Sequence, residues 1–219
     1  MSDEVVVVVS GGEAPRPETA FAVPPGARVI AADGGLEHAL ALGLAVTTAI
    51  GDFDSVGAAA LDSAASAGIE LVRHPEAKDA TDLELALDAA VALGPTRVLV
   101  LAGDGGRLDH LLATLLLLGS ERYAGVQLDA EIGEASAHVI RAERELDGQR
   151  GLLVSLLPLH GPAEGVWTSG LGYPLAGETL EPGSSRGVSN VFADDTARIR
   201  VDRGVLLVVV PGPEYEAPR

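Results

Sequence analysis

Two aspartates separated by one residue, Asp52 and Asp54, follow the apolar run Ala45–Ile50 in the stretch Gly51-Asp52-Phe53-Asp54-Ser55. If this stretch is extended, both carboxylates point to the same face of the backbone. Such a pair suits Mg²⁺, which takes one or two carboxylates and completes its shell with water and substrate phosphates. The alternative is a polar turn in which aspartate serves only as a turn former. The stretch by itself leaves both interpretations open.

Further polar residues each follow a predicted strand, and their types suit one kind of chemistry. They are Ser10-Gly11-Gly12, Asp33-Gly34-Gly35, Lys78-Asp79 with Asp82, and Arg107 with Asp109 and His110. Carboxylates combined with a few cations suit magnesium-dependent transfer of a phosphoryl or pyrophosphoryl group. In that chemistry the carboxylates hold the metal, while Lys78 and Arg107 bind phosphates. Either a carboxylate or His110 then orients the attacking hydroxyl group.

Some of these residues also have a purely structural interpretation. Asp33 could simply precede a Gly-Gly turn, and Asp82 could simply cap a helix. Arg107 and His110 lie one turn apart at a predicted helix start, where an anion is favoured. The common nucleotide loops are absent, because the chain has no GxxxxGK[ST] and Leu108 occupies the position where GxGxxG needs its last glycine. A nucleotide would therefore be held in another way.

Strands and helices alternate through the first part of the chain. The apolar patterns predict strands at 5–9, 28–32, 45–50, 69–73, 97–102 and 126–132. They predict helices at 36–42, 57–67, 81–93 and 108–118. This alternation predicts an α/β domain with a mostly parallel sheet and helices on both faces. Ligands bind at the carboxyl ends of the strands in such sheets, so we expect the polar clusters to meet at one edge.

The pattern changes in the later part of the chain. Short apolar runs alternate there with Gly, Pro and Ser turns, at Gly151–Leu157, Gly165–Thr168, Ala197–Val201 and Val205–Val210. This is typical of an all-β sandwich or barrel. We therefore predict an α/β catalytic domain at residues 1–138 and a β-sandwich domain at residues 139–219.

Composition excludes several classes of protein. The net charge of −17 argues against a nucleic-acid-binding protein, and it means that an anionic nucleotide needs a metal or a local cation. The chain has no cysteine, no basic segment ahead of its first apolar run and no apolar run long enough to span a membrane. We therefore expect a cytoplasmic protein. Lys78 is the only lysine and Asn190 the only asparagine, which makes both candidates for specific roles.

The first part of the chain resembles the catalytic domain of thiamine pyrophosphokinases in four segments, DGG at 33–35, GDFDS at 51–55, KDATDLELAL at 78–87 and GGRLDH at 105–110. The later part is similar to the thiamine-binding domain of that family in SGLGYPL at 169–175 and GVSN at 187–190. These segments keep the order and spacing of the family over nearly the whole chain. Lys78 and Asn190 both lie inside them.

The resemblance implies a Mg²⁺-dependent enzyme that transfers a pyrophosphoryl group from ATP to the hydroxyl group of thiamine, giving thiamine diphosphate and AMP. It implies an N-terminal α/β domain and a C-terminal β-sandwich. It also implies a homodimer in which thiamine binds near the interface between one subunit's α/β domain and the other's sandwich.

The resemblance also implies roles for individual residues. Asp52, Asp54 and Asp82 would bind the metal, and Asp33 and Asp79 would support the metal and the phosphates. Lys78, Arg107 and His110 would face ATP. Asp109, Ser189 and Asn190 would face thiamine or the junction of the two substrates, with Asp109 counted among the catalytic residues beside Asp52, Asp54 and Asp82.

Two residues depart from the family pattern. Thr114 stands where the family has asparagine, and Val191 follows Ser189-Asn190 where an acidic residue is common. One alternative is a pyrophosphokinase of the same fold that acts on another hydroxyalkyl heterocycle, such as a pterin. Another is a non-catalytic sensor of thiamine or a nucleotide. The segments of the later part favour thiamine, and the retained carboxylates favour an enzyme.

Overall fold

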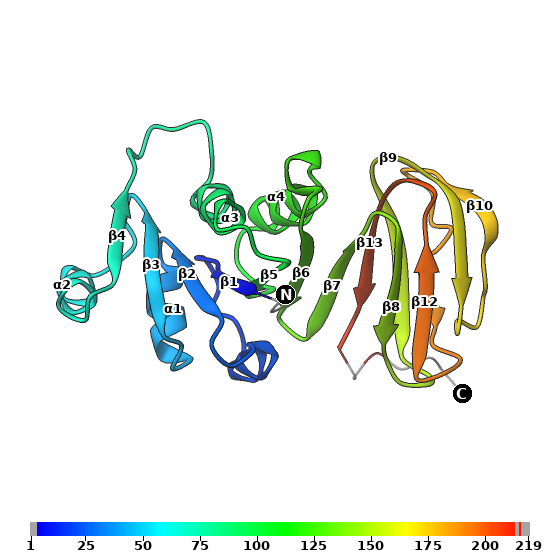
Figure 1. The fold of residues 1–219 in the computed structure, drawn as a ribbon, viewed down its shortest axis with the longest axis horizontal. Coiled ribbons are helices and arrows are strands. Elements are labelled where there is room, and N and C mark those ends of the chain that lie inside the picture. The colour runs from blue at the N-terminus through cyan, green and yellow to red at the C-terminus, as the bar shows by residue number, and fades with distance from the viewer. Residues whose placement is uncertain (1–3, 213–214, 216–219) are drawn as a thin grey trace. The chain divides into compact units, whose positions relative to one another are not determined.

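The computed structural model describes residues 4–212 and residue 215, and the chain divides into two compact units (Figure 1). The first unit contains the residues up to Thr114 together with Gly125–Gly133. The second unit contains Leu115–Ala124 and the residues from Glu134 onwards. Each unit has its own apolar core.

The sheet of the first unit is parallel and has the strand order β4-β3-β2-β1-β5-β6. Its strands are β1 (Val5–Val9), β2 (Arg28–Ala32), β3 (Val46–Gly51), β4 (Glu70–Arg73), β5 (Arg97–Ala102) and β6 (Gln127–Ile132). The valines of β1 pair with β2 on one side and β5 on the other, and four of these valines are fully buried. A run of β-branched residues without alternation is what such a central parallel strand requires.

Helices follow the strands of this unit; the sequence predicted the four α-helices but not the 3₁₀ helix η1. They are η1 (Pro17–Ala22), α1 (Gly35–Ala41), α2 (Ala58–Ser66), α3 (Asp82–Ala92) and α4 (Leu108–Leu118), the last of which crosses the division between the units. The Thr81 side chain caps α3 by accepting the backbone N–H of Glu84 at 3.2 Å. Asp82 is therefore the first helical residue, and its interpretation as the helix cap is wrong.

Two helices pack on the strands that surround β1. Helix α1 packs against β1, β2 and β3, and α3 packs against these three strands and β5. Gly35 at the start of α1 permits this approach, because a Cβ atom there would lie 2.2 Å from the carbonyl oxygen of Val9. The start of α1 thus lies directly against the end of β1, close to Asp33.

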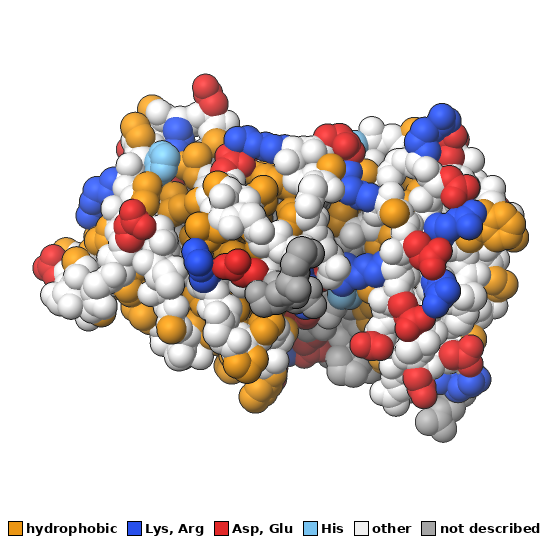
Figure 2. Space-filling view, in the orientation of Figure 1, with side chains coloured by type: hydrophobic (Ala, Val, Ile, Leu, Met, Phe, Trp, Pro, Cys, Tyr) orange, Lys and Arg blue, Asp and Glu red, His pale blue; other side chains and the backbone are white. Residues whose placement is uncertain are grey.

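The second unit is antiparallel and has the strand order β7-β13-β9-β12-β8, with β10 and β11 also paired to β9. Its elements are η2 (Glu121–Tyr123), β7 (Ala135–Ile140), β8 (Glu143–Asp147), β9 (Leu153–Ser169), β10 (Ala176–Leu180), β11 (Asn190–Val191), β12 (Thr196–Arg200) and β13 (Arg203–Val210). Acidic and basic side chains alternate over β8 and β12, where Arg198 pairs with Glu143 and Glu145 (Figure 2).

The apolar runs Gly151–Leu157, from its third residue, and Gly165–Thr168 belong to one long strand, β9, and are not separated by a turn. The pairing register with β13 shifts between Leu159 and Glu164, so that the residues between them form a bulge. The bulge contains Pro and Gly residues, which suggested a turn in the sequence. It instead bends one strand, so that its first part pairs with β13 and its second part with β10 and β12.

Residues 115–124 belong with the second unit because several contacts hold them there. Arg141 donates hydrogen bonds to the carbonyl oxygens of Gly119 and Ser120 and to the carboxylate of Glu121. A ring nitrogen of His160 lies 2.8 Å from the carbonyl oxygen of Leu116. The last boundary between the compact units lies between residues 133 and 134. The sequence placed the domain boundary between residues 138 and 139, and that boundary stays a prediction. In the described residues, no helix combines the length and the apolar character needed to cross a membrane.

Candidate active site

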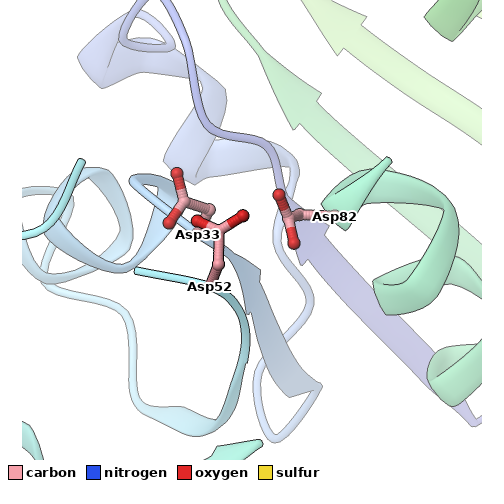
Figure 3. Close-up of side chains that lie close together, drawn as sticks. All are labelled: Asp33, Asp52 and Asp82. Carbon is pink, nitrogen blue, oxygen red and sulfur yellow. The ribbon is translucent and has the colours of Figure 1, made fainter. Parts of the chain in front are cut away.

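Three carboxylates meet at the carboxyl end of the parallel sheet. Asp33 follows β2 and Asp52 follows β3, two neighbouring strands in which Ala32 pairs with Ile50. Asp82 begins α3, which packs against both strands. One carboxylate oxygen from each of the three side chains lies within 4.8 Å of the other two, and the side chains lie close together (Figure 3). We call Asp33, Asp52 and Asp82 the acidic cluster.

Lys78 is the cation that faces the acidic cluster. Its Nζ donates to Oδ2 of Asp52 at 2.9 Å and lies 3.0 Å from Oδ1 of Asp82. The hydrogen bond from Lys78 is the main reason why the pKa of Asp52 lies below its usual value, and the backbone N–H of Asp54 adds to this effect. Burial lowers the pKa of Lys78, but its contacts with Asp52 and Asp82 outweigh burial and raise it. Both groups therefore stay charged around neutral pH.

Two oxygens of the acidic cluster, Oδ1 of Asp33 and Oδ1 of Asp82, are buried and accept no hydrogen bond from any described residue. The nearest cation to Oδ1 of Asp82 is the Lys78 ammonium at 3.0 Å. A buried carboxylate oxygen without a donor is costly, and one ammonium does not balance three carboxylates. Hard oxygen ligands with an excess of negative charge fit a divalent cation of the magnesium type.

Asp54 and Asp79 lie outside the acidic cluster. Asp54 is exposed, and repulsion from Asp52, then partial loss of solvent, then repulsion from Asp33 raise its pKa. Its carboxylate is therefore close enough to the acidic cluster to affect the charge there. Asp79 is also exposed. The sequence grouped Asp54 with Asp52 and Asp82, whereas in the structure Asp33 takes that place.

Arg107, Asp109 and His110 follow β5 at the same end of the sheet, and all three are exposed. Arg107 donates to both carboxylate oxygens of Asp109, with its Nη2 at 2.6 Å from Oδ2 and its Nε at 3.2 Å from Oδ1. Arg107 thereby holds the pKa of Asp109 at about 2, and Asp109 in turn raises the pKa of Arg107. Within residues 4–212 and 215, no hydrogen bond or ion pair links these three side chains to the acidic cluster.

Ser189 and Asn190 lie in the second unit and line an open pocket of about 520 Å³. The other residues of its wall are Tyr173, Leu175, Ser184, Ser185, Arg186, Gly187 and Val188. Both segments that the sequence marked in this part of the chain, 169–175 and 187–190, therefore contribute to one pocket. Ser189 is exposed in a left-handed backbone conformation with φ of 56°, and its N–H donates to the hydroxyl group of Ser155.

The side chain of Asn190 is buried and binds the backbone of the pocket wall. Its Nδ2 donates to the carbonyl oxygen of Tyr173 at 2.8 Å, and its Oδ1 accepts the N–H groups of Tyr173 and Val191. Among side chains of this length, only asparagine offers both a donor and an acceptor to the backbone of Tyr173. This explains why the one asparagine of the chain stands at position 190. Asn190 thus positions Tyr173. Val191 packs against Gly172, the residue before Tyr173, and Thr114 is half-buried on α4.

Sequence reasoning missed two residues near the acidic cluster. Ser55 donates to Oδ2 of Asp33 at 2.5 Å, although the sequence named it only as part of a motif. Phe53 has a left-handed backbone with φ of 60°, so the stretch is not extended and the two aspartates that flank Phe53 do not share a face. Local spacing gives no signal for a phenylalanine in this conformation.

Two family models match most of the chain. The model described as thiamin pyrophosphokinase, catalytic domain, matches residues 26–128. The model described as thiamin pyrophosphokinase, vitamin B1 binding domain, matches residues 137–206. The first match includes the acidic cluster and the second includes the pocket around Asn190.

Similar proteins carry the same description. A thiamine pyrophosphokinase of Bacillus subtilis (strain 168) is 27% identical over 186 residues, which are 82% of this chain and 85% of the relative. The crystal structure of a thiamine pyrophosphokinase from Bacillus subtilis has a TM-score of 0.83 at 23% identity and covers 95% of this chain and 99% of its own. A thiamin pyrophosphokinase family protein from Enterococcus faecalis has a TM-score of 0.79 at 26% identity, with coverage of 95% and 98%.

Proposed function

The chain belongs to the thiamine pyrophosphokinase family and is by that membership a thiamine diphosphokinase; from this premise we propose that it uses Mg²⁺ and ATP to form thiamine diphosphate and AMP. In this reaction the hydroxyl oxygen of thiamine attacks the β-phosphorus of ATP. The bond between that phosphorus and the oxygen of the α-phosphate breaks, AMP leaves, and the hydroxyl proton is released. The observation that carries the proposal is the acidic cluster with its two donor-free buried oxygens.

In this proposal Asp33, Asp52 and Asp82 hold the metal. Asp54 is a further metal ligand, exposed beside them, and the charges of Asp52 and Asp33 raise its pKa. When bound, the ion neutralises charge on the phosphates of ATP. Lys78 already lies at the acidic cluster, so its ammonium can bind a phosphate oxygen beside the metal site. Asp79 is the next residue and is assigned a supporting role.

Arg107, Asp109 and His110 form the second half of the proposed nucleotide and acceptor site. Arg107 and His110 are exposed at the start of α4 and are assigned to the phosphates of ATP. Asp109, with a pKa of about 2, is a weak base at neutral pH. We therefore assign Asp109 an electrostatic role toward the cationic acceptor or its hydroxyl group rather than the role of proton acceptor.

Thiamine is proposed to bind in the pocket of the second unit. Tyr173 and Val188 are exposed there and offer apolar surface to an aromatic ring. Ser189 offers polar groups at the rim. Asn190 contributes by holding the wall, since its Oδ1 accepts two backbone N–H groups and its Nδ2 donates to a backbone carbonyl oxygen.

The finer description of the fold is also part of the proposal. We infer that helices cover both faces of the parallel sheet, because Val7 and Val9 share an apolar cluster with Ala39 of α1 while α3 contacts the same strands. We infer a β-sandwich for the second unit, because β9 bends and one apolar cluster contains residues from β8, β9, β12 and β13. A cytoplasmic location agrees with the absence of cysteine.

A homodimer is proposed as well, and α4 supports it. Leu108, Leu112 and Leu116 recur every four residues on one face of α4 and are 69%, 51% and 49% exposed. Residues 111–118 carry no charge, so a second copy of a chain with a net charge of −17 can approach there without like-charge repulsion. A stripe at this spacing can pack against an identical stripe about a twofold axis.

The proposed reaction is tested by incubating the protein with Mg²⁺, ATP and thiamine and by identifying the products with ³¹P NMR and chromatography. The expected products are AMP and thiamine diphosphate in equal amounts. Formation of ADP, or release of AMP at the same rate without thiamine, would contradict the proposal. A pterin carrying a hydroxymethyl group serves as the competing acceptor, and faster turnover of that compound would favour a related pyrophosphokinase.

A matched pair of variants links the reaction to the acidic cluster. Asp52→Asn should lower turnover by about 10²- to 10³-fold, the size expected when one preorganised electrostatic contact is removed. Asp62→Asn makes the same chemical change at an exposed position of α2 and should leave turnover unchanged. Tight binding of thiamine and ATP without any turnover by the wild-type protein would instead favour a sensor.

A further inference from the structure

Phe53 has a backbone conformation that is rare for a bulky residue. It lies between Asp52 and Asp54 with φ of 60°, in the left-handed region where glycine is favoured. Such a conformation persists only when the surroundings hold the residue in it. The left-handed conformation of Phe53 therefore needs an explanation in its contacts.

The ring of Phe53 is held from two sides. It is only 5% exposed and packs in an apolar cluster with Ala31, Leu36, Ala49, Val56 and Ala64. The guanidinium of Arg73 lies 5.1 Å from the centre of the ring, and the backbone of Arg73 pairs with Gly51 across β3 and β4. Apolar burial and the cation–π contact thus both oppose any movement of the ring out of this position.

The turn at Phe53 determines where the neighbouring carboxylates point. The N–H of Asp54 donates to Oδ1 of Asp52 at 3.2 Å, which leaves Oδ2 of Asp52 to Lys78. Asp52 thereby joins Asp33 and Asp82 in the acidic cluster, while Asp54 stays exposed. In an extended chain both aspartates would share one face, and the charge of Asp54 would be added directly to that of Asp52.

A second left-handed residue lies directly across from this turn. Asp33 has φ of 46°, and a Cβ atom on Gly51 would lie 3.0 Å from the Cβ atom of Asp33. The neighbouring strands β2 and β3 therefore each lead into a left-handed residue beside or within the acidic cluster. Of the two, only Phe53 has a side chain that is free of the cluster and anchored in the core.

We propose that Phe53 is a positioning residue for the acidic cluster, whose buried ring and contact with Arg73 hold Asp52 in the orientation that binds a divalent cation. This inference rests on the proposed metal site. Phe53 touches neither substrate nor metal in it and acts through the backbone of Asp52 and Asp54. Loss of the ring is therefore expected to weaken metal binding even where the left-handed conformation is allowed.

The test is binding of Mn²⁺, measured by calorimetry on the folded protein without substrates. Phe53→Gly permits the left-handed backbone but removes the ring, and it should weaken Mn²⁺ binding by about 10- to 100-fold, the range seen when a group that orients a metal ligand is lost. Phe53→Tyr keeps the ring and should bind Mn²⁺ like the wild type. Arg73→Gln should give a smaller loss than Phe53→Gly.

A matched control separates positioning from general loss of stability. Val56→Ala removes apolar volume from the same cluster without changing residues 52–54, so it should lower the thermal midpoint but leave Mn²⁺ affinity unchanged. Wild-type affinity in Phe53→Gly, or an equal loss in Val56→Ala, overturns the inference while the metal site stands. Absence of Mn²⁺ binding by the wild type overturns the metal site and this inference together.

Discussion

The ammonium group of Lys78 lies 2.9 Å from Oδ2 of Asp52 and connects the loop before α3 to the end of β3. Both side chains are mostly buried, with 14% and 16% of their surfaces exposed. An ion pair of this kind is screened far less by water than an exposed one. The stability of the first unit should therefore depend on how well Lys78 balances the negative charge of the acidic cluster.

Lys78→Met tests this connection. The variant leaves Asp52 and Asp82 without their cation, so the free energy of unfolding of the metal-free protein should fall by about 2 kcal/mol, as for other hydrogen bonds to charged groups. Added Mn²⁺ should raise the thermal midpoint of the variant more than that of the wild type, because the carboxylates gain a replacement cation. Urea unfolding with and without Mn²⁺ measures both effects.

Arg28→Met is the matched control for Lys78→Met. Arg28 pairs with Glu4 at 3.3 Å on an exposed surface, where loss of an ion pair costs at most about 1 kcal/mol. Mn²⁺ should have the same effect on this variant as on the wild type. Equal losses in the two variants would show that Lys78 is an ordinary surface cation.

Asp54 gives a prediction about pH. Repulsion from Asp52 raises the pKa of Asp54 in the folded protein above the ordinary value of 3.8, so its ionisation opposes folding. In EDTA, the Asp54→Asn variant should therefore have a higher thermal midpoint than the wild type at pH values above the raised pKa of Asp54. Well below pH 3.8 the two proteins should have the same midpoint. Calorimetric scans from pH 3 to pH 7 test this, with Asp62→Asn as the control that should show no gain. A midpoint that falls in Asp54→Asn at neutral pH would contradict the prediction.

Much of the first unit could be predicted from sequence because each of its signals is local. Short apolar runs ended by polar or glycine residues predicted the bounds of β1, β2 and β5 as the structure has them. The carboxyl ends of parallel strands lie at one edge of a sheet, which predicts that the polar residues after these strands meet there. Asp33, Asp52 and Asp82 do lie together at that edge. The left-handed conformation of Phe53 was not predictable, because it depends on Arg73 and on core residues from other elements.

The second unit was harder to predict because tertiary contacts override its local signals. The proline and glycine residues between Leu157 and Gly165 indicated a turn, but β9 continues through them because Pro158 and Leu159 pair with β13 and Ala163 pairs with β10. Asn190 was marked by its rarity and by its place in the segment 187–190. Its bonds to Tyr173 come from a segment that lies well apart in sequence, so spacing could not reveal them.

Asn190→Asp tests the positioning role of this amide. A carboxylate would place an oxygen against the carbonyl oxygen of Tyr173, where the amide now donates at 2.8 Å. Loss of that donor beside a buried charge should cost about 3 kcal/mol in the free energy of unfolding. Because Tyr173 lines the pocket, KM for thiamine should rise more than KM for ATP. Gln149→Glu, the same change at an exposed position, should alter neither quantity, and a normal KM for thiamine in Asn190→Asp would refute the role.

Leu112→Glu tests the proposed homodimer. Leu112 lies in the middle of the exposed leucine stripe of α4, and in a twofold pairing two new carboxylates would face each other in an apolar interface. The variant should therefore elute as a monomer where the wild type elutes as a dimer, with molar mass measured by light scattering. Leu40→Glu is the control, because Leu40 is 43% exposed on α1 and lies outside the stripe, so this variant should keep the wild-type mass. A Leu112→Glu protein that stays dimeric, or a monomeric wild type, would remove α4 as the dimer interface.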